Sequence, residues 1–264
     1  MKCPMCAYPF MNRPKGMMSL PLFKKIVDDA AINSHEIKWL NLFGEPLLWP
    51  YLVDGFAYLT SKGLNAKIST NGMLLTPDLA ARLSKAGLRE ALVAIDTLRP
   101  DAYARLRIGG NLETIKKNIH EVLAAVPNLI ISAQFMPSKY NVGESGAAFL
   151  QEFGNRPNFR IENWFVVRMS PLAENVSRTL SHGPNQVDKR KCNKLYEGVC
   201  VLWDGRTSLC CLDYDGDMIT GDLNKNSIES SYMGPAAEEF RRRIVRGEWG
   251  NLPACARCLA DHII

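Results

Sequence analysis

Apolar and polar residues alternate along the first two thirds of the chain in two rhythms, one typical of helices and one typical of buried strands. Apolar residues recur at helical spacing within 19–34, whereas 90–96 and 129–135 are nearly continuous apolar runs. Such runs indicate strands covered on both faces. Strands are predicted at 36–43, 65–70, 90–96, 129–135 and 159–169, and helices at 19–34, 50–62, 76–87, 99–107, 113–126 and 143–153.

This alternation predicts an α/β fold, a parallel sheet with helical crossovers. It stops near residue 168, and 171–191 is polar and aperiodic. A cysteine-rich tail, 192–264, follows, in which 201–211 reads as a hairpin turning at Asp204 and Gly205. We therefore expect one domain over 1–170, a linker over 171–191 and a small second domain over 192–264.

Composition narrows the class of protein. The 264 residues are 47% apolar and 22% charged, with a net charge of +5. The basic residues are interspersed with acidic ones, which argues against a nucleic-acid partner. No apolar run reaches the ~20 residues of a membrane span, and the N-terminus lacks the apolar core of a secretory signal. We therefore expect a cytoplasmic protein, in which some of the eight cysteines are metal ligands rather than disulfides.

The cysteines are spaced like metal ligands. Cys3 and Cys6 form one CxxC pair, Cys255 and Cys258 form a second, and the predicted hairpin carries Cys210. A hairpin thiolate together with a distant CxxC can hold one tetrahedral site. Zinc and an iron–sulfur cluster both fit that description, and spacing alone does not separate them.

Five motifs in register resemble the radical S-adenosylmethionine (SAM) enzymes that carry a C-terminal SPASM or twitch domain. "CPMC" (3–6) matches the last two cysteines of the family's CxxxCxxC motif. "FGEPLL" (43–48), "STNG" (69–72) and "AID" (94–96) match its strand ends. The Cx12Gx4C…CxxC pattern of the tail resembles the twitch variant. The resemblance implies a partial (β/α)6 barrel, here lacking its first strand, followed by a small cluster domain.

The resemblance also implies cofactors and ligands. A [4Fe–4S] cluster would bind SAM, and an auxiliary [4Fe–4S] cluster would occupy the tail. Cys211 or Cys200 could replace a tail ligand, but both more often serve as small buried residues. The implied metal ligands are Cys3, Cys6, Cys192, Cys210, Cys255 and Cys258, and the implied SAM-binding residues are Gly44, Glu45, Pro46, Ser69, Asn71 and Arg107.

One part of the motif is absent from the sequence. The first cysteine of CxxxCxxC would lie four residues before Cys3, upstream of Met1. We expect that the sequence begins downstream of the natural start; an in-frame upstream cysteine in the gene would establish this. The alternative is a remnant that has lost SAM cleavage.

By the family mechanism, a 5′-deoxyadenosyl radical would abstract hydrogen from the substrate. We expect a two-electron oxidation of a sugar or aminocyclitol alcohol, because the short chain and four-cysteine tail resemble 2-deoxy-scyllo-inosamine dehydrogenase. The alternatives are a peptide-modifying maturase and a non-catalytic metal-binding protein with zinc or a single cluster. Arg168, at the end of the last predicted strand, is the candidate for orienting the substrate. A flavodoxin or ferredoxin would supply electrons.

Overall fold

The chain divides into two compact units. The computed structural model describes residues 1–41, 43–163, 170, 172, 176 and 192–258. One unit contains residues 1–6, 36–166 and 172–178, and the other contains 7–35, 167–171 and 179–264. Among the described residues, no helix has the length and apolar character needed to cross a membrane.

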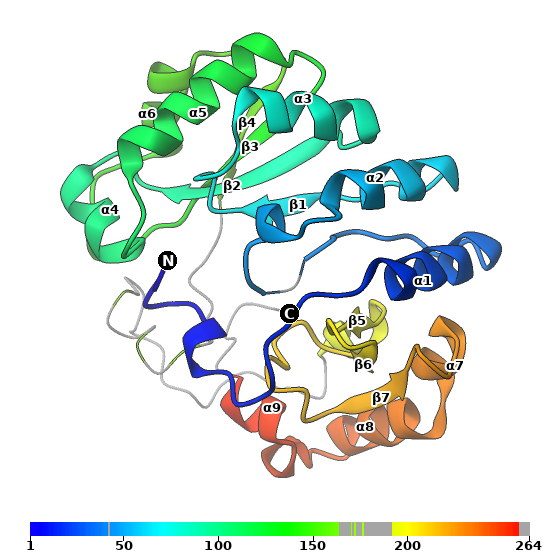
Figure 1. Ribbon diagram of the computed structural model, residues 1–264. Helices are drawn as coiled ribbons and strands as arrows, with labels where there is room; N and C mark the ends of the chain where they lie inside the picture. Colours follow the sequence, from blue (N-terminus) through cyan, green and yellow to red (C-terminus); the bar gives the residue numbers. More distant parts are fainter. Residues whose placement is uncertain (42, 164–169, 171, 173–175, 177–191, 259–264) are drawn as a thin grey trace. The chain divides into compact units, whose positions relative to one another are not determined.

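The first unit is built on a parallel sheet. Its strand order is β1 (Ile68–Thr70), β2 (Glu90–Asp96), β3 (Ile130–Phe135) and β4 (Phe159–Asn163) (Figure 1). Helices follow the strands as crossovers, which confirms the predicted α/β fold class. The helices of this unit are α2 (Leu52–Ser61), α3 (Pro77–Ala86), α4 (Pro100–Leu106), α5 (Leu112–Ala125), α6 (Gly146–Phe153) and the 3-10 turn η2 (Pro46–Leu48).

Local sequence signals explain these elements. Every residue of β2 is buried, as expected of a central strand between two covered faces. The Thr76 hydroxyl accepts from the Leu79 amide at 3.3 Å and begins α3, while Gly87, with a φ of 116°, ends it. The interior is therefore apolar, with few charged side chains inside it.

Glu90 is one buried charge that the sheet accommodates. Its carboxylate lies 2.7 Å from the Lys67 ammonium and accepts a hydrogen bond from the Ser132 hydroxyl at 2.7 Å. Burial alone would raise the pKa of Glu90, but these two hydrogen bonds outweigh it and lower the pKa below its usual value. Glu90 is therefore held as a carboxylate at the start of β2.

The strand predicted at 36–43 is wrong in its extent. Among the described residues of this segment, Trp39 forms a single parallel bridge to Lys67. The Leu40 amide donates to the Lys67 carbonyl, and the Lys67 amide donates to the Lys38 carbonyl, each at 3.0 Å. The backbone is extended beside β1, but this short pairing does not make it a strand. Residues 164–169 of the strand predicted at 159–169 lie outside the described residues.

The second unit contains an antiparallel sheet and short helices. Strands β5 (Cys200–Val201) and β6 (Arg206–Ser208) form the hairpin predicted around Asp204 and Gly205, and β7 (Ile219–Asp222) pairs with β6. Its helices and 3-10 turns are η1 (Tyr8–Phe10), α1 (Leu20–Ile32), η5 (Asn193–Tyr196), α7 (Ile228–Met233), α8 (Pro235–Val245), η6 (Trp249–Asn251) and α9 (Pro253–Arg257).

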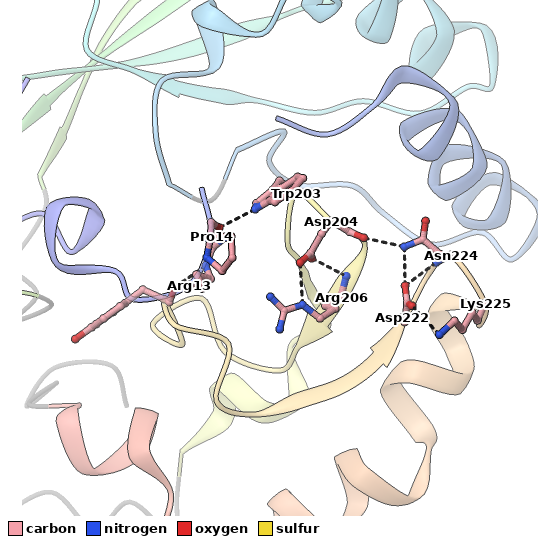
Figure 2. A network of polar contacts seen from close by, with 9 residues as sticks. Arg13, Pro14, Trp203, Asp204, Arg206, Asp222, Asn224 and Lys225 are labelled. Atoms are coloured by element: carbon pink, nitrogen blue, oxygen red, sulfur yellow. Dashed lines mark hydrogen bonds and ion pairs between the residues drawn. The ribbon is translucent and has the colours of Figure 1, made fainter. Parts of the chain in front are cut away.

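The segment that follows the first cysteine pair belongs to this second unit. Figure 2 shows the Trp203 indole N–H donating to the Pro14 carbonyl, at 2.9 Å, beside the Asp204–Arg206 ion pair. The Arg13 guanidinium donates to the Tyr214 carbonyl at 2.6 Å. The first residues after the cysteine loop are thus bound to the hairpin of the C-terminal sheet.

Helix α1 is attached to the same unit further along. The Lys25 ammonium donates to the Asn224 carbonyl at 2.7 Å, and the Ile228 amide donates to the Asp29 carboxylate at 2.6 Å. The linker predicted at 171–191 lies outside the described residues except for Leu172 and Val176, so its boundaries stay a prediction.

Candidate functional site

Glu45 connects two of the predicted motifs at the C-terminal end of β1. Its Oε1 accepts from the Thr70 hydroxyl at 2.6 Å, and its Oε2 accepts from the Asn71 amide at 2.8 Å. The Leu47 amide adds a third hydrogen bond at 3.1 Å. Gly44 precedes it with a φ of 92°, a left-handed conformation in which a side chain is strained. The "GEP" and "STNG" segments are therefore one hydrogen-bonded structure.

The neighbouring strand, β2, ends in a buried ion pair. The Asp96 carboxylate lies 2.5 Å from Nη2 and 2.6 Å from Nε of Arg107. Its other oxygen accepts from the Gln134 amide at 2.9 Å. Asp96 has a φ of 63°, and the register of β2 against β3 shifts between Ala94 and Asp96. This irregularity turns the carboxylate away from its ordinary place in the strand pleat.

Arg107 connects the ion pair to the first cysteine. Its Nη1 lies 3.7 Å from the Cys3 sulfur. Burial alone would lower the pKa of Arg107, but attraction by Asp96 and by a Cys3 thiolate outweighs it and raises the pKa. The guanidinium thus stays charged beside the Cys3 sulfur.

The cysteine loop is held against this structure by apolar packing and backbone bonds. Cys3 and Met5 are buried in a cluster with Leu106, Met136 and Val176. The Cys6 amide donates to the Cys3 carbonyl at 3.1 Å, which closes a tight turn. Cys6 packs at the edge of the same cluster, so both sulfurs of the CxxC pair lie on one loop beside the C-terminal end of β2.

A buried phenol beside the cysteine loop has an unused hydrogen-bonding group. The Tyr103 oxygen is buried and has no hydrogen-bond partner among the described residues. Desolvation raises the pKa of Tyr103 to about 12. A Cβ placed on Gly110 would lie 2.4 Å from this oxygen. The loop therefore offers two thiols, a charged guanidinium and a free O–H donor, a set that fits a cluster with anionic sulfur atoms.

The predicted tail ligands lie on elements that share one apolar core. Cys210 and Cys255 both pack against the cluster formed by residues such as Leu195, Met218 and Leu252. The Cys255 sulfur lies 3.7 Å from the Met218 sulfur. Cys192 directly precedes η5, which contributes Leu195 to that core, and Cys258 directly follows α9.

A zinc ion and a four-iron cluster require different spacings of their thiolate ligands. Four thiolates around zinc, each about 2.3 Å from the metal, lie roughly 4 Å from one another. Within the described part of the chain, no three Cys, His, Asp or Glu side chains gather closely enough to hold a single metal ion. A four-iron cluster separates its ligands more widely, so the placement of the tail cysteines around one core is compatible with it.

The structure brings some of the predicted site residues together and leaves others apart. Glu45 and Asn71 are hydrogen-bonded, Arg107 lies against Cys3, and Ser69 is held through its amide by the Asn41 side chain at 2.9 Å. Pro46 is buried at the start of η2 and has no polar role there. Arg168 lies outside the described residues. The assignment of all these residues to SAM and metal binding stays a prediction.

Sequence reasoning missed some functional contacts. Thr70 and Asn41 were not among the predicted site residues. The Thr70 hydroxyl donates to Glu45, and the Asn41 side chain accepts from the amide of Ser69 in the "STNG" segment. Gln134 lies inside the apolar strand β3, and its side-chain amide donates to Asp96. A polar residue inside an apolar strand is a sequence signal for such a contact, but the alternation of side chains along the strand does not tell which face of the sheet the polar side chain lies on.

Comparisons with known proteins give these features a family. The sequence pattern of the radical SAM superfamily matches residues 1–138, and that of the SPASM iron–sulfur cluster-binding domain matches residues 192–259. The chain belongs to the radical SAM superfamily, with a C-terminal SPASM domain. The cofactors implied by these two domains are a [4Fe–4S] cluster, an auxiliary cluster and SAM.

Two curated relatives match different lengths of the chain. A probable GTP 3′,8-cyclase of Methanococcus maripaludis is 33% identical over 126 residues, 47% of this chain and 41% of the cyclase. The tungsten-containing aldehyde ferredoxin oxidoreductase cofactor-modifying protein of Pyrococcus furiosus is 29% identical over 247 residues, 80% of this chain and 67% of that protein. The chain thus spans about two fifths of the cyclase.

Solved structures share the fold over nearly the whole chain. BtrN in complex with AdoMet and 2-DOIA has a TM-score of 0.65 at 15% identity, covering 98% of this chain and 87% of BtrN. Native anSMEcpe with bound AdoMet and the Kp18Cys peptide has a TM-score of 0.66 at 13% identity, covering 98% of this chain and 86% of that one. The shared fold includes both units.

Proposed function

We propose that this protein is a radical SAM enzyme that oxidises a small polar substrate by two electrons, a sugar or aminocyclitol alcohol. The observation that carries the proposal is a set of contacts at the C-terminal ends of two neighbouring strands. At the end of β2, Arg107 contacts both Cys3 and Asp96, and at the end of β1, Glu45 accepts a hydrogen bond from Asn71. Ligand sites of parallel α/β folds lie at this edge of the sheet. When bound, the SAM-binding cluster would supply the electron that cleaves SAM into methionine and a 5′-deoxyadenosyl radical.

The residues of this chain would bind the cluster and SAM and would orient them. Cys3 and Cys6 would supply two thiolates to the cluster, and Arg107 would place its positive charge beside the Cys3 sulfur. The carboxylate of Glu45 is fixed by Thr70 and Asn71 so that it can accept from the SAM amino group. A fixed arrangement of this kind aims the reactive species at one C–H bond, which is the protein's contribution to such chemistry.

The tail cysteines would hold the auxiliary cluster. Cys192, Cys210, Cys255 and Cys258 would fill all four iron sites, so the cluster would have no open coordination position. Such a cluster is suited to accepting the second electron of the oxidation. A two-electron alcohol oxidation needs such an acceptor after hydrogen abstraction, so the tail cluster would serve the proposed reaction. The fold shared with BtrN, whose structure holds 2-DOIA, supports the same assignment.

Peptide modification is the second candidate. It is favoured by the similar fold of anSMEcpe, whose structure holds the Kp18Cys peptide. The two candidates differ in product. Incubation with SAM, a flavodoxin-type reductant and either an aminocyclitol or a cysteine-containing peptide would give a ketone with the first substrate. A mass change on the peptide alone would support the second candidate instead.

The cofactor content can be tested without knowing the substrate. The full reading frame of the gene, expressed and purified without oxygen, should be brown and contain about eight irons per chain, because two four-iron clusters are expected. Replacing both Cys3 and Cys6 by alanine should remove about half of the iron and abolish release of 5′-deoxyadenosine from SAM. Replacing Cys200 by alanine is the matched control and should change neither. A colourless protein with one zinc ion would refute the proposal.

A further inference from the structure

Arg241 is a buried arginine of the second unit with an unusual environment. It lies in α8 and is 7% exposed. Its guanidinium carbon lies 4.3 Å from the centre of the Tyr232 ring and 5.4 Å from the centre of the Tyr196 ring. Its Nε donates to the Leu195 carbonyl at 3.1 Å. The Tyr232 hydroxyl donates to the Tyr196 carbonyl at 2.8 Å, which fixes the two rings around the guanidinium.

This guanidinium lacks a counter-charge in the part of the chain that the structure describes. No described carboxylate forms an ion pair with it, and its buried Nη2 has no hydrogen-bond partner there. Its neighbours on α8 differ, because Arg242 pairs with Glu239 at 3.1 Å and Arg243 with Glu248 at 3.6 Å. Arginine cannot lose its charge in a protein, so a buried guanidinium needs an anion nearby. Two aromatic faces stabilise it only in part.

The surroundings of Arg241 indicate which anion this is. The carbonyl that Arg241 binds belongs to Leu195, three residues after Cys192, and Leu195 packs in the same core as Cys210 and Cys255. A four-iron cluster bound by four thiolates is an anion in both of its usual oxidation states. Arg241 is placed on the framework that would surround it.

We propose that Arg241 is the counter-ion of the auxiliary cluster and a positioning residue for the loop that carries Cys192. The inference rests on the proposed function, because it requires the cluster. Through its Nε the side chain holds the turn after Cys192, and through its charge it stabilises the anionic cluster. The reduced cluster carries one more negative charge than the oxidised one, so a nearby cation favours reduction. The cluster would accept an electron from the substrate radical more readily.

The test measures the reduction potential of the auxiliary cluster alone. In the full-length protein with Cys3 and Cys6 replaced by alanine, only the tail cluster remains. Its one-electron reduction by dithionite, followed through its EPR signal with redox mediators, makes and breaks no covalent bond. In this background we expect Arg241→Met to lower the equilibrium constant for reduction at least tenfold, equal to a 59 mV more negative potential. Arg241→Lys, which keeps the charge, should remain within threefold of the parent.

Arg242→Gln is the matched control, because it removes the same charge from the same helix at an exposed position. It should leave the potential unchanged. The inference is overturned if Arg241→Met binds its full complement of iron and keeps the potential of the parent. If Arg241→Met gives no folded protein, Arg241→Gln is measured in its place: a tenfold lower equilibrium constant for reduction supports the counter-ion role, and the potential of the parent overturns it. Absence of iron from the parent itself overturns both this inference and the proposed function.

Discussion

Replacing Asp96 by asparagine tests the ion pair on which the candidate site depends. The carboxylate is fully buried and binds Arg107 through two contacts of 2.5 and 2.6 Å. Asparagine has nearly the same shape, but it leaves the 12% exposed guanidinium without a counter-charge. Removing one partner of a buried pair costs about 3–5 kcal/mol. We therefore expect the free energy of unfolding of the apoprotein to fall by about that amount.

The assay is urea denaturation of the apoprotein, followed by circular dichroism, in the wild type and two variants. The control is Asp101→Asn, which makes the same chemical change in an exposed pair, Arg99–Asp101, with contacts of 2.9 Å. Exposed pairs contribute little, so the control should unfold at the wild-type urea concentration. Equal urea midpoints for Asp96→Asn and Asp101→Asn would refute the claim that the buried Asp96–Arg107 pair stabilises the protein. In the holoprotein, Asp96→Asn should also weaken retention of iron at Cys3, because Arg107 is no longer held in place.

Three further predictions concern stability and can be measured by urea denaturation. Gly87→Ala should lower the free energy of unfolding by at least about 2 kcal/mol, because a Cβ would lie 1.9 Å from a neighbouring side-chain oxygen and the residue has a φ of 116°. Gly63→Ala is the control: this residue has a φ of 74° and open space around it, so the loss should be only about 1 kcal/mol. Folding lowers the pKa of Glu90, so its carboxylate stabilises the protein at pH values above the ordinary glutamate pKa of about 4.3. This contribution disappears as the pH falls below that pKa. Glu90→Gln should therefore lose less stability than the wild type between pH 5 and 3. Gly16→Ala should cost about 1–3 kcal/mol, since a Cβ would lie 2.6 Å from the Trp203 indole, and adding Trp203→Ala should remove that penalty.

Much of the fold could be predicted because its signals are local. The apolar run of β2, the hairpin turn at Asp204 and Gly205, and the Thr76 and Gly87 ends of α3 are each set by a few adjacent residues. The strand predicted at 36–43 shows where local reasoning fails. Its apolar residues fit a strand, but pairing depends on how far the partner near Lys67 extends, which the segment itself does not encode.

The membership of residues 7–35 in the second unit could not be predicted from sequence order. The contacts that place them join Pro14 to Trp203 and Asp29 to Ile228, about two hundred positions apart. Each is a single hydrogen bond to a backbone group, so no residue type marks its partner. The chain changes unit between Cys6 and Ala7, directly after the cysteine pair.

The candidate site was predicted as separate motifs, and sheet register explains why they meet. Thr70 of β1 pairs with Val93 of β2, so the hydrogen bonds that Glu45 accepts from Thr70 and Asn71 lie at the end of the strand next to β2, which ends three residues after Val93 at Asp96. A slip of one residue in this register would turn every side chain of one strand to the other face. The register is fixed by the buried apolar residues of β2, none of which is part of the site. The arrangement of Glu45 and Arg107 at one edge is therefore a consequence of core packing, and variants that disturb the β1–β2 register should lose both features together.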